Sequence, residues 1–410
     1  MRTALYNLSI QLLKLLLPLG AKFSAKIALF YRGRKNLLTN IQADLSTNTN
    51  TLFWVHCSSV GEFEQGLPVI ELLKKEQPAW KVVVTFFSPS GYEAVNHPII
   101  DYKYYLPYDT AQNASRFIEL VNPRLAIFVK YEYWYHMLTA LRAKQIPAYS
   151  VSSIFRPTQT FFKWFGGWNR KMLAHFTHFM VQDQQSVKLL NSIGLTNATQ
   201  TGDSRFDRVL ELKTSEVKFP EIEDFTSNKT VFIIGSLRAE DDDVIFSFIN
   251  ANPQFTYIIA PHDITEKHMS KIELALKSTI RHSNLTPQSK KKTLIIDSIG
   301  KLSKLYQLAN FAYIGGGFSD GIHNILEPAV YNIPIFFGNK HYKKYKEAVD
   351  LIALEAAFTV ENAADLTKAV NHINNEQELI KLSSRIENYV NSNTGAAQKV
   401  VTIINPSVAK

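Results

Sequence analysis

From about residue 50 onward, short apolar runs alternate with segments whose apolar residues recur at helical spacing. Short apolar runs predict buried strands, and their alternation with amphipathic helices is typical of parallel α/β folds. We expect strands at residues 51–57, 81–86, 124–129, 148–152 and 179–182, and a second series at 230–234, 255–260, 292–297, 311–314 and 333–337. The sequence therefore predicts the same architecture twice.

A more polar stretch separates the two series. We expect residues 1–40 to form an N-terminal helical segment, 41–208 a first Rossmann-like domain, 209–228 a linker and 229–410 a second Rossmann-like domain. The predicted fold class is thus α/β, with two doubly wound domains. Each sheet places a ligand crevice at its carboxyl edge, and we expect the two edges to face one another across a cleft.

The composition is that of a globular chain, with 46% hydrophobic and 20% charged residues, which excludes disordered, collagen-like and coiled-coil classes. Cys57 is the single cysteine. It excludes an internal disulfide framework and a cysteine-based zinc cluster, and it fits a reducing compartment. The formal net charge of +9 favours an anionic partner: nucleic acid, a phosphorylated small molecule or an acidic membrane.

The first 43 residues contain basic side chains but no aspartate or glutamate. Leucines at positions 5, 8, 12, 15, 16 and 19 predict an amphipathic helix with an apolar stripe. Gln11, Lys14, Pro18 and Lys22 interrupt the apolar run, so lying in a membrane interface is favoured over crossing the bilayer. We expect association with an anionic membrane surface. A signal peptide and a helix that packs only on its own domain are the alternatives.

The first predicted strand runs into the turn S-S-V-G-E at residues 58–62, and a helical pattern follows. Glu62 therefore lies on the expected crevice edge, where a carboxylate can accept a proton from a hydroxyl nucleophile as general base. Ser59 and Glu62 also have the spacing of a capping box, which requires no function. Gly61 permits close approach of the backbone to a ligand, which a cap does not require.

Two further turns lie at the same edge of the first predicted sheet. Glu132 follows the strand at 124–129, and together with Glu62 it forms a pair of carboxylates suited to an acceptor substrate. The turn S-P-S-G at residues 88–91 opens the next helix and offers backbone N–H groups to an anion. The residues expected on the acceptor side are Ser59, Gly61, Ser88, Ser90 and Lys130.

Three consecutive glycines at residues 315–317 follow a strand of the second series. Their amides can close on a phosphate, and a helix N-terminus near Asn324 adds a favourable dipole. Glu327, on that helix, can bind ribose hydroxyls. The spacing is neither a G-x-G-x-x-G fingerprint nor a Walker motif. Together with the adjacent histidine, asparagine and glutamate, the glycines indicate a nucleotide-sugar site.

Two other features have simpler interpretations. The acidic run at residues 240–243 opens a helical pattern, so we interpret it as a helix N-terminus rather than a metal cluster. His262 closes a strand and can contact a base or a phosphate, although a lone surface histidine is the alternative. No spacing resembles H-E-x-x-H or an EF-hand loop.

These motifs together resemble those of the 3-deoxy-D-manno-octulosonic acid (Kdo) transferases of lipid A assembly, which are inverting glycosyltransferases of the GT-B fold. The resemblance covers nearly the whole chain. It rests on the basic, apolar N-terminus and on residues 56–62, 84–91, 105–109, 130–134, 201–207 and 315–328. The turn S-V-G-E at 59–62 and the run G-x-H-N-x-L-E-P at 321–328 are the most specific motifs.

The resemblance implies transfer of Kdo from CMP-Kdo to a sugar hydroxyl of a lipid A precursor, with Glu62 as general base and Glu132 beside it. It implies contacts of the CMP part of the donor with Pro261, His262, Gly316, Gly317, Phe318, Asn324, Ile325, Leu326 and Glu327. No cofactor and no metal are expected besides the co-substrate. The expected location is the cytoplasmic face of the inner membrane.

The chain departs from the family pattern in three places. Where the family usually has Ser-Thr-His, this chain has Ser236, Leu237 and Arg238. An arginine commonly follows the proline that matches Pro261, and here the residue is His262. The family's E-x-x-W-P ending is W-Y at residues 134–135. The first two departures concern the donor side and indicate a divergent branch.

Two other functions fit parts of the sequence. Another enzyme of the same two-domain fold, such as a UDP-sugar epimerase or a transferase for a different lipid, would bind UDP-sugars in preference to CMP. A nucleic-acid-binding protein would explain the net charge of +9. However, the basic residues concentrate before Asp44 beside the leucine stripe rather than among stacking aromatics, so no nucleic acid is expected.

Overall fold

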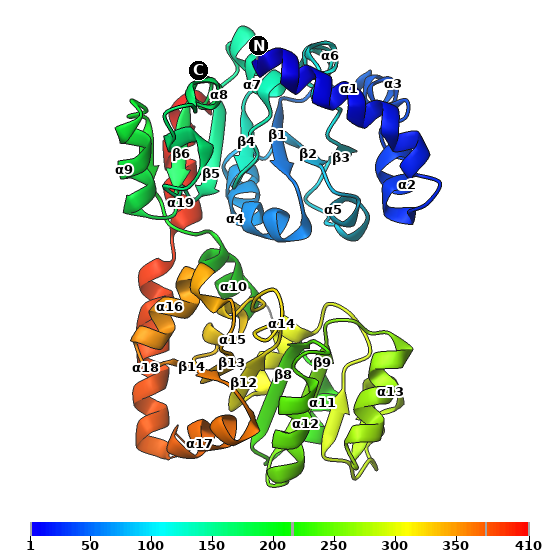
Figure 1. The fold of residues 1–410 in the computed structure, drawn as a ribbon, viewed down its shortest axis with the longest axis vertical. Helices are drawn as coiled ribbons and strands as arrows, with labels where there is room; N and C mark the ends of the chain where they lie inside the picture. Colours follow the sequence, from blue (N-terminus) through cyan, green and yellow to red (C-terminus); the bar gives the residue numbers. More distant parts are fainter. Residues whose placement is uncertain (1, 215–216, 374, 409–410) are drawn as a thin grey trace. The chain divides into compact units, whose positions relative to one another are not determined.

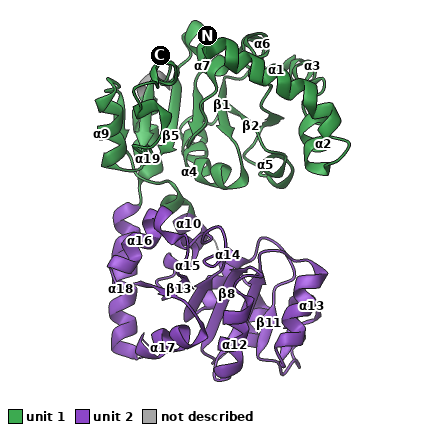
Figure 2. Ribbon diagram, in the orientation of Figure 1, with its two compact units in different colours: residues 1–208, 394–410 green, residues 209–393 purple. Residues whose placement is uncertain are grey.

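The computed structural model describes residues 2–214, 217–373 and 375–408 (Figure 1). It divides the chain into two compact units. Unit 1 comprises residues 1–208 and 394–410, and unit 2 comprises residues 209–393 (Figure 2). Each unit is built on one seven-stranded parallel sheet with helices on its faces, so the predicted α/β architecture is confirmed for both units.

The sheet of unit 1 has the strand order β3-β2-β1-β4-β5-β6-β7. Its strands are β1 (Leu52–Cys57), β2 (Lys81–Phe86), β3 (Tyr102–Tyr105), β4 (Ala126–Val129), β5 (Ala148–Ser153), β6 (His178–Val181) and β7 (Ala198–Gln200). Every residue of β1 and β4 is buried, as expected for central strands of a parallel sheet covered on both faces. The order reverses between β1 and β4, and ligands bind α/β sheets at the carboxyl ends of such a pair.

The helices of unit 1 are α1 (Arg2–Gly20), α2 (Ala25–Arg32), α3 (Leu37–Leu45), α4 (Val60–Glu76), α5 (Pro89–Ala94), α6 (Ala111–Val121), α7 (Tyr135–Ala143), α8 (Gly167–Leu173), α9 (Gln184–Ser192) and α19 (Ala396–Val408), with a short 3-10 turn η1 (Thr160–Phe162). The C-terminal helix α19 packs against α4, because Val401 and Ile404 lie in the same buried cluster as Phe63 and Leu67.

The sheet of unit 2 has the order β10-β11-β9-β8-β12-β13-β14, which reverses between β8 and β12. Its strands are β8 (Val231–Leu237), β9 (Thr256–Pro261), β10 (Thr279–Arg281), β11 (Thr293–Ile295), β12 (Phe311–Ile314), β13 (Ile335–Gly338) and β14 (Ala357–Val360). Its helices are α11 (Pro220–Thr226), α12 (Asp242–Ala251), α13 (Glu266–Ala275), α14 (Leu302–Leu305), α15 (Leu326–Ala329), α16 (Lys346–Ala353), α17 (Ala363–Ile373) and α18 (Glu376–Asn393), with 3-10 turns η2 (His282–Asn284), η3 (Tyr306–Leu308) and η4 (Tyr342–Lys344).

The ten strands expected from the apolar runs are all present, within a few residues of their expected ends. Four more strands, β3, β7, β10 and β14, lie at the edges of the two sheets. The expected domain limits differ from the two units: residues 1–40 belong to unit 1 together with residues 41–208, and the expected linker, residues 209–228, belongs to unit 2. Helix α10 (Arg205–Thr214) continues through residue 208 into the expected linker, and residues 394–410 lie in unit 1 rather than in the second domain. Residues 215–216 of that linker lie outside the described part of the chain.

Helix α1 is dark blue in Figure 1, and two of its contacts with the rest of unit 1 are hydrogen bonds. Trp168 Nε1 donates a hydrogen bond of 2.9 Å to Thr3, and Tyr6 donates its hydroxyl proton to Asp109. Of its leucines Leu17 is buried, while the others are between 38% and 74% exposed: Leu5, Leu8, Leu12, Leu13, Leu15, Leu16 and Leu19. The predicted helix thus has its apolar stripe on the outside. None of the described helices is long and apolar enough to cross a membrane.

Arg34 fastens the N-terminal helices to the carboxyl edge of the sheet. Its side chain is buried and donates hydrogen bonds of 2.8 Å to the carbonyl oxygens of Leu106, after β3, and Phe87, after β2. Its guanidinium carbon lies 3.7 Å from the centre of the Phe30 ring of α2. Burial lowers the pKa of Arg34 to about 10, which leaves the side chain cationic at neutral pH.

Candidate functional site

Glu62 lies in the first turn of α4, directly after β1. Its carboxylate accepts a hydrogen bond from the main-chain N–H of Ser58, not from that of Ser59 as in a capping box. The side chain of Ser59 makes no cap hydrogen bond either. Neither hydrogen bond of a capping box is therefore present, although the carboxylate of Glu62 does bind a main-chain N–H group. Glu62 as a residue remains half-buried.

Glu132 follows β4, the neighbour of β1, so both carboxylates lie at the point where the strand order reverses. Its Oε2 atom lies 3.1 Å from Nε2 of His56 and 2.8 Å from Nε1 of Trp134. The side chain of Glu132 is 11% exposed, and that of His56 is fully buried. The geometry brings together the two carboxylates that the sequence predicted and adds a buried histidine and a tryptophan to them.

The two carboxylates have opposite electrostatic environments. Burial and the nearby charge of Glu132 raise the pKa of Glu62 to about 6, against smaller lowering effects of Ser58, His56 and Lys130. Burial of Glu132 also opposes its ionisation, but the hydrogen bonds from His56, Trp134 and Ser58 outweigh this and lower its pKa. Such a separation is typical of an acid–base pair: one carboxylate stays ionised while its neighbour exchanges protons near neutral pH.

The residues expected on the acceptor side differ in how they contact Glu62 and Glu132. Lys130 has a left-handed backbone, with φ of 61°, and its charge lowers the pKa of Glu62. The hydroxyls of Ser88 and Ser90 bond to each other at 2.7 Å, and the N–H of Ser88 donates to the carbonyl of Ser58. The 88–91 turn therefore packs on the turn that precedes Glu62. A Cβ atom on Gly61 would meet open space, so packing does not require a glycine there.

The sequence interpretation missed three residues of unit 1. His56 belongs to a buried apolar strand, where a histidine is indistinguishable from an ordinary core residue, and Trp134 belongs to a short aromatic run. The third residue, Asp203, is buried. Its carboxylate accepts hydrogen bonds of 2.6 Å from the side chains of Gln65 and Arg205. Burial opposes ionisation of Asp203, but the charge and hydrogen bonds of Arg205, with the charge of Lys130, lower its pKa.

In unit 2, the glycine turn at residues 315–317 follows β12 and packs tightly between the ends of its neighbours. A Cβ atom on Gly315 would lie 2.2 Å from the carbonyl oxygen of Ser236, and one on Gly317 would lie 2.4 Å from the nitrogen of Gly338. The N–H of Gly315 donates to Gly235, and that of Gly316 donates to Asp241 at 2.8 Å. Two of the three amides expected to bind a phosphate are thus used within the fold.

Next to this turn, Arg238 lies between two histidines. Its Nε atom donates to Nε2 of His323 at 3.0 Å, and its terminal nitrogen lies 3.3 Å from Nε2 of His262. The two imidazole rings are 4.5 Å apart. Burial, then the nearby His262 and Arg238, lower the pKa of His323 to about 4, and burial and Arg238 lower that of His262. Both rings are therefore neutral near pH 7, and Arg238 carries the positive charge of this three-residue group at the carboxyl ends of β8 and β9.

The remaining donor residues lie on the same edge but differ in accessibility. Ile325 and Leu326 are fully buried, main chain included, so they shape the site from beneath. Asn324 donates to Glu327 at 3.1 Å and accepts from the N–H of Leu326, the first residue of the short helix α15. Pro261 ends β9 in the core, and Phe318 is half-buried. The predicted donor residues are thus close in space, with Arg238 and His323 added to them.

The acidic run at residues 240–243 opens α12, as interpreted from the sequence. Asp242 is buried and pairs with Lys271 at 2.8 Å and with His268 at 3.1 Å. Among the residues that the structure describes, no group of three or more histidine, cysteine, aspartate or glutamate side chains could hold a metal ion.

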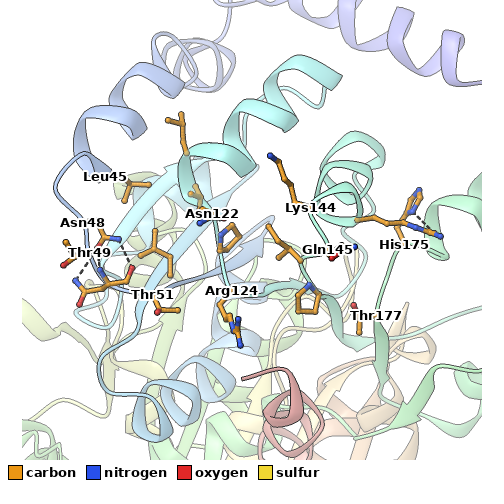
Figure 3. Close-up of a pocket in the computed structure, with 18 residues that line it drawn as sticks. Leu45, Asn48, Thr49, Thr51, Asn122, Arg124, Lys144, Gln145, His175 and Thr177 are labelled. Carbon is orange, nitrogen blue, oxygen red and sulfur yellow. Dashed lines mark hydrogen bonds between the residues drawn. The ribbon is translucent and has the colours of Figure 1, made fainter. Parts of the chain in front are cut away.

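Unit 1 also contains a wide pocket of about 910 Å³ at the opposite, amino edge of its sheet (Figure 3). The loops before β1, β4, β5 and β6 line it, and Arg124, Lys144 and His175 lie around its rim at some distance from one another. It contains none of the predicted site residues. Of its basic groups, Arg142 and His175 lie 3.2 Å apart, and Arg124 and Lys144 lie elsewhere on the rim.

Comparisons with known proteins agree with this picture. Residues 32–208 match the family model of 3-deoxy-D-manno-octulosonic-acid transferase (kdotransferase). The 3-deoxy-D-manno-octulosonic acid transferase of Rickettsia felis is 25% identical over 89% of this chain and 84% of its own length. That of Haemophilus influenzae is 24% identical over 86% of both chains.

A solved structure shares the fold of both units. The UDP-GlcNAc 2-epimerase of Neisseria meningitidis, bound to UDP-GlcNAc, superposes with a TM-score of 0.59 over 86% of this chain and 98% of its own, at 16% identity. An identity this low shows the fold alone. The sequence resemblance is confirmed by the family model and the relatives, and the chain is a glycosyltransferase related to the 3-deoxy-D-manno-octulosonic acid transferases along most of its length.

Proposed function

We propose that this enzyme transfers Kdo from CMP-Kdo to a sugar hydroxyl of a lipid A precursor, with Glu62 as the general base. The observation that carries the proposal is the pair of carboxylates at the carboxyl edge of unit 1: Glu62, whose pKa is raised to about 6 by burial and by Glu132, and Glu132, which stays ionised. A base whose pKa lies near the working pH combines a large ionised fraction with useful basicity.

In the proposed step, the carboxylate of Glu62 removes the proton of the acceptor hydroxyl as that oxygen attacks the anomeric carbon of Kdo. The bond between this carbon and the phosphate oxygen breaks, and its electron pair leaves with CMP. Direct displacement inverts the configuration of the anomeric carbon. No covalent enzyme intermediate is needed, since the acceptor oxygen is itself the nucleophile.

We assign the donor to the carboxyl edge of unit 2. CMP-Kdo carries a single phosphate, whose charge grows as CMP leaves, and the cation of Arg238 fixed by two neutral imidazoles suits it. Glu327, half-buried after the glycine turn, is suited to the ribose hydroxyls. The proposal assigns stabilisation of the leaving group to these side chains, and it includes no metal and no cofactor besides CMP-Kdo.

We further propose that α1 lies on the anionic, cytoplasmic face of the inner membrane. Its leucines face outward although leucine side chains normally pack inside, and Phe23 and Trp164 of the same unit are 83% and 91% exposed. Basic residues accompany them without any acidic residue before Asp44. Apolar insertion and attraction to anionic headgroups would bring a lipid-bound acceptor and unit 1 to the same surface.

The variant Glu62→Gln tests the base. It keeps the shape of the side chain but cannot accept the proton, so we expect transfer to fall at least a hundredfold while the affinity for CMP-Kdo stays within twofold. The assay follows labelled CMP-Kdo into a lipid A precursor in membranes.

In the wild type, transfer should fall as the pH drops below about 6, because Glu62 must be ionised to act as a base.

Glu76→Gln is the matched control, because Glu76 is an exposed carboxylate on the last turn of the same helix. Wild-type rates in Glu62→Gln would contradict the role of the base. A wild-type protein that binds UDP-sugars in preference to CMP would instead point to another enzyme of the same fold.

A further inference from the structure

Both ring nitrogens of the buried His56 have partners. Nδ1 lies 2.8 Å from the hydroxyl oxygen of Thr85 and 3.1 Å from its carbonyl oxygen. Nε2 lies 3.1 Å from Oε2 of Glu132 and 3.0 Å from Nε1 of Trp134, and this Nε1 lies 2.8 Å from the same Oε2 atom. Thr85 and His56 are both fully buried, so these contacts do not compete with solvent. Glu132 is thus held by donors that arise from β1 and from the start of α7.

The hydroxyl of Thr85 is the partner of Nδ1 through which the position of the His56 proton can be set. Nε1 of Trp54 donates to this hydroxyl oxygen at 2.8 Å, so the hydroxyl is free to donate its own proton to Nδ1. In that arrangement Nε2 carries the ring proton, and it donates to the same Oε2 atom of Glu132 as Trp134, whose Nε1 lies nearer to this oxygen than to Nε2. If the ring binds a second proton, Nδ1 donates to the carbonyl of Thr85 and Nε2 still donates to Glu132. In both states Glu132 receives a hydrogen bond from His56.

We propose that His56 is a positioning residue of the reaction: its Nε2–H, together with Trp134, holds Glu132 as a fixed carboxylate anion beside Glu62. This inference rests on the proposed function in so far as Glu62 is the base. A buried carboxylate without donors favours its protonated, neutral form. Neutral Glu132 would no longer oppose the loss of the proton from Glu62, and Glu62 would become a weaker base.

The other groups around the pair fit this assignment. Ser58 donates its main-chain N–H to Glu62, and Lys130 is the cation that acts on Glu62 from the end of β4. The thiol of Cys57 between them is fully buried, and burial, with the charges of Glu62 and Glu132, raises its pKa well above the usual value. Cys57 therefore contributes no charge, and the side chains that hydrogen-bond to Glu132 are those of His56, Trp134 and Ser58.

A pair of substitutions at Thr85 tests the proposal without removing the histidine. Thr85→Val lacks the hydroxyl, so Nδ1 is expected to donate to the carbonyl of residue 85, and a neutral ring then has no proton on Nε2. Thr85→Ser keeps the hydroxyl and is the matched control. We expect Thr85→Val to lower the transfer rate at pH 7 at least tenfold. The acid limb, where the transfer rate falls with decreasing pH, should also move to lower pH by half a unit or more. In Thr85→Ser the acid limb should stay at the wild-type pH.

Two substitutions at His56 provide the rescue test. Gln has an amide N–H that can reach Glu132, whereas Leu has none, so His56→Gln should keep the wild-type acid limb and His56→Leu should lose it. Thermal unfolding shows whether each variant is folded, and the Thr85 pair decides the question if His56→Leu is not. An acid limb that is unchanged in both Thr85→Val and His56→Leu would overturn the proposal, because a purely structural role lowers the rate without moving the limb.

Nitrogen-15 NMR of the wild-type imidazole separates this inference from the proposed function, since it needs no transfer. We expect a protonated Nε2 on His56 from pH 6 to pH 8. A bare Nε2 in this range would overturn the positioning role even if the enzyme transfers Kdo. Conversely, an active Glu62→Gln variant would remove the proposed base and leave the NMR result untouched.

Discussion

At the scale of single residues, Arg238 is a cation with no carboxylate paired to it among the described residues, and its guanidinium is fixed by His262 and His323. A charge-assisted hydrogen bond to a phosphate contributes about 1.5–3 kcal/mol. We therefore expect Arg238→Gln to weaken CMP binding roughly ten- to a hundredfold, by isothermal titration calorimetry, and to leave cytidine binding unchanged. Equal losses for CMP and cytidine would show that Arg238 supports the fold of the site and not the phosphate.

Single residues also show where prediction from sequence ends. Glu62 and Glu132 could be predicted because each directly follows a buried strand, and the strand order brings those two strands together. His56 could not, because its partner Glu132 is 76 positions away along the chain and the contact exists only after the sheet has formed. The glycines at 315–317 were interpreted as a phosphate site, but their neighbours, Ser236 and Gly338, show that close packing of strand ends requires at least Gly315 and Gly317.

At the scale of secondary-structure elements, α1 offers a test within three consecutive residues. Leu15 and Leu16 are 74% and 59% exposed, whereas Leu17 is 7% exposed. The double variant Leu15→Ser/Leu16→Ser should lower binding to vesicles rich in anionic phosphatidylglycerol about tenfold or more and leave the Tm unchanged, since about 1.5–3 kcal/mol is lost per apolar side chain that would enter the membrane. Co-sedimentation measures the binding. Leu17→Ser should lower the Tm and leave vesicle binding unchanged. Loss of vesicle binding in Leu17→Ser but not in the double variant would contradict the membrane role of the stripe.

The elements themselves were largely predictable. Each of the ten expected strands is a run of apolar residues in the middle of a sheet, where both faces are covered, and such a run leaves a clear pattern. The four strands that were missed are the edge strands of the two sheets, and β7 and β10 have three residues each and are not buried. A strand this short leaves no period in the sequence. The amphipathic character of α1 was predicted, and its exposed leucines are compatible with the preferred interpretation as a membrane-surface helix, which stays a prediction.

At the scale of the whole molecule, the chain does not follow a simple order of first domain, linker and second domain. After α18 it returns to unit 1, where Asp207 accepts a hydrogen bond of 2.7 Å from the N–H of Ala397 and so caps α19. The apolar face of α19 then covers α4, the helix that carries Glu62. Nothing in the pattern of residues 394–410 distinguishes this helix from another helix of the second domain, since both would have one apolar face.

Because the chain returns to unit 1, the C-terminal helix α19 belongs to the unit assigned to the acceptor. A substitution in α19 should therefore affect transfer and leave CMP binding by unit 2 unchanged. Val401 is fully buried in the cluster beneath α4, so Val401→Asp places an unpaired charge in the core and is expected to destabilise unit 1 by about 3 kcal/mol or more. Transfer should then fall in proportion to the unfolding of unit 1, while binding of CMP by unit 2 stays near the wild-type value. Gln398→Asp adds the same charge at an exposed position of α19 and should change neither quantity. If Val401→Asp instead abolished CMP binding and left unit 1 stable, α19 would act with unit 2 and the division of the chain into these two units would be wrong.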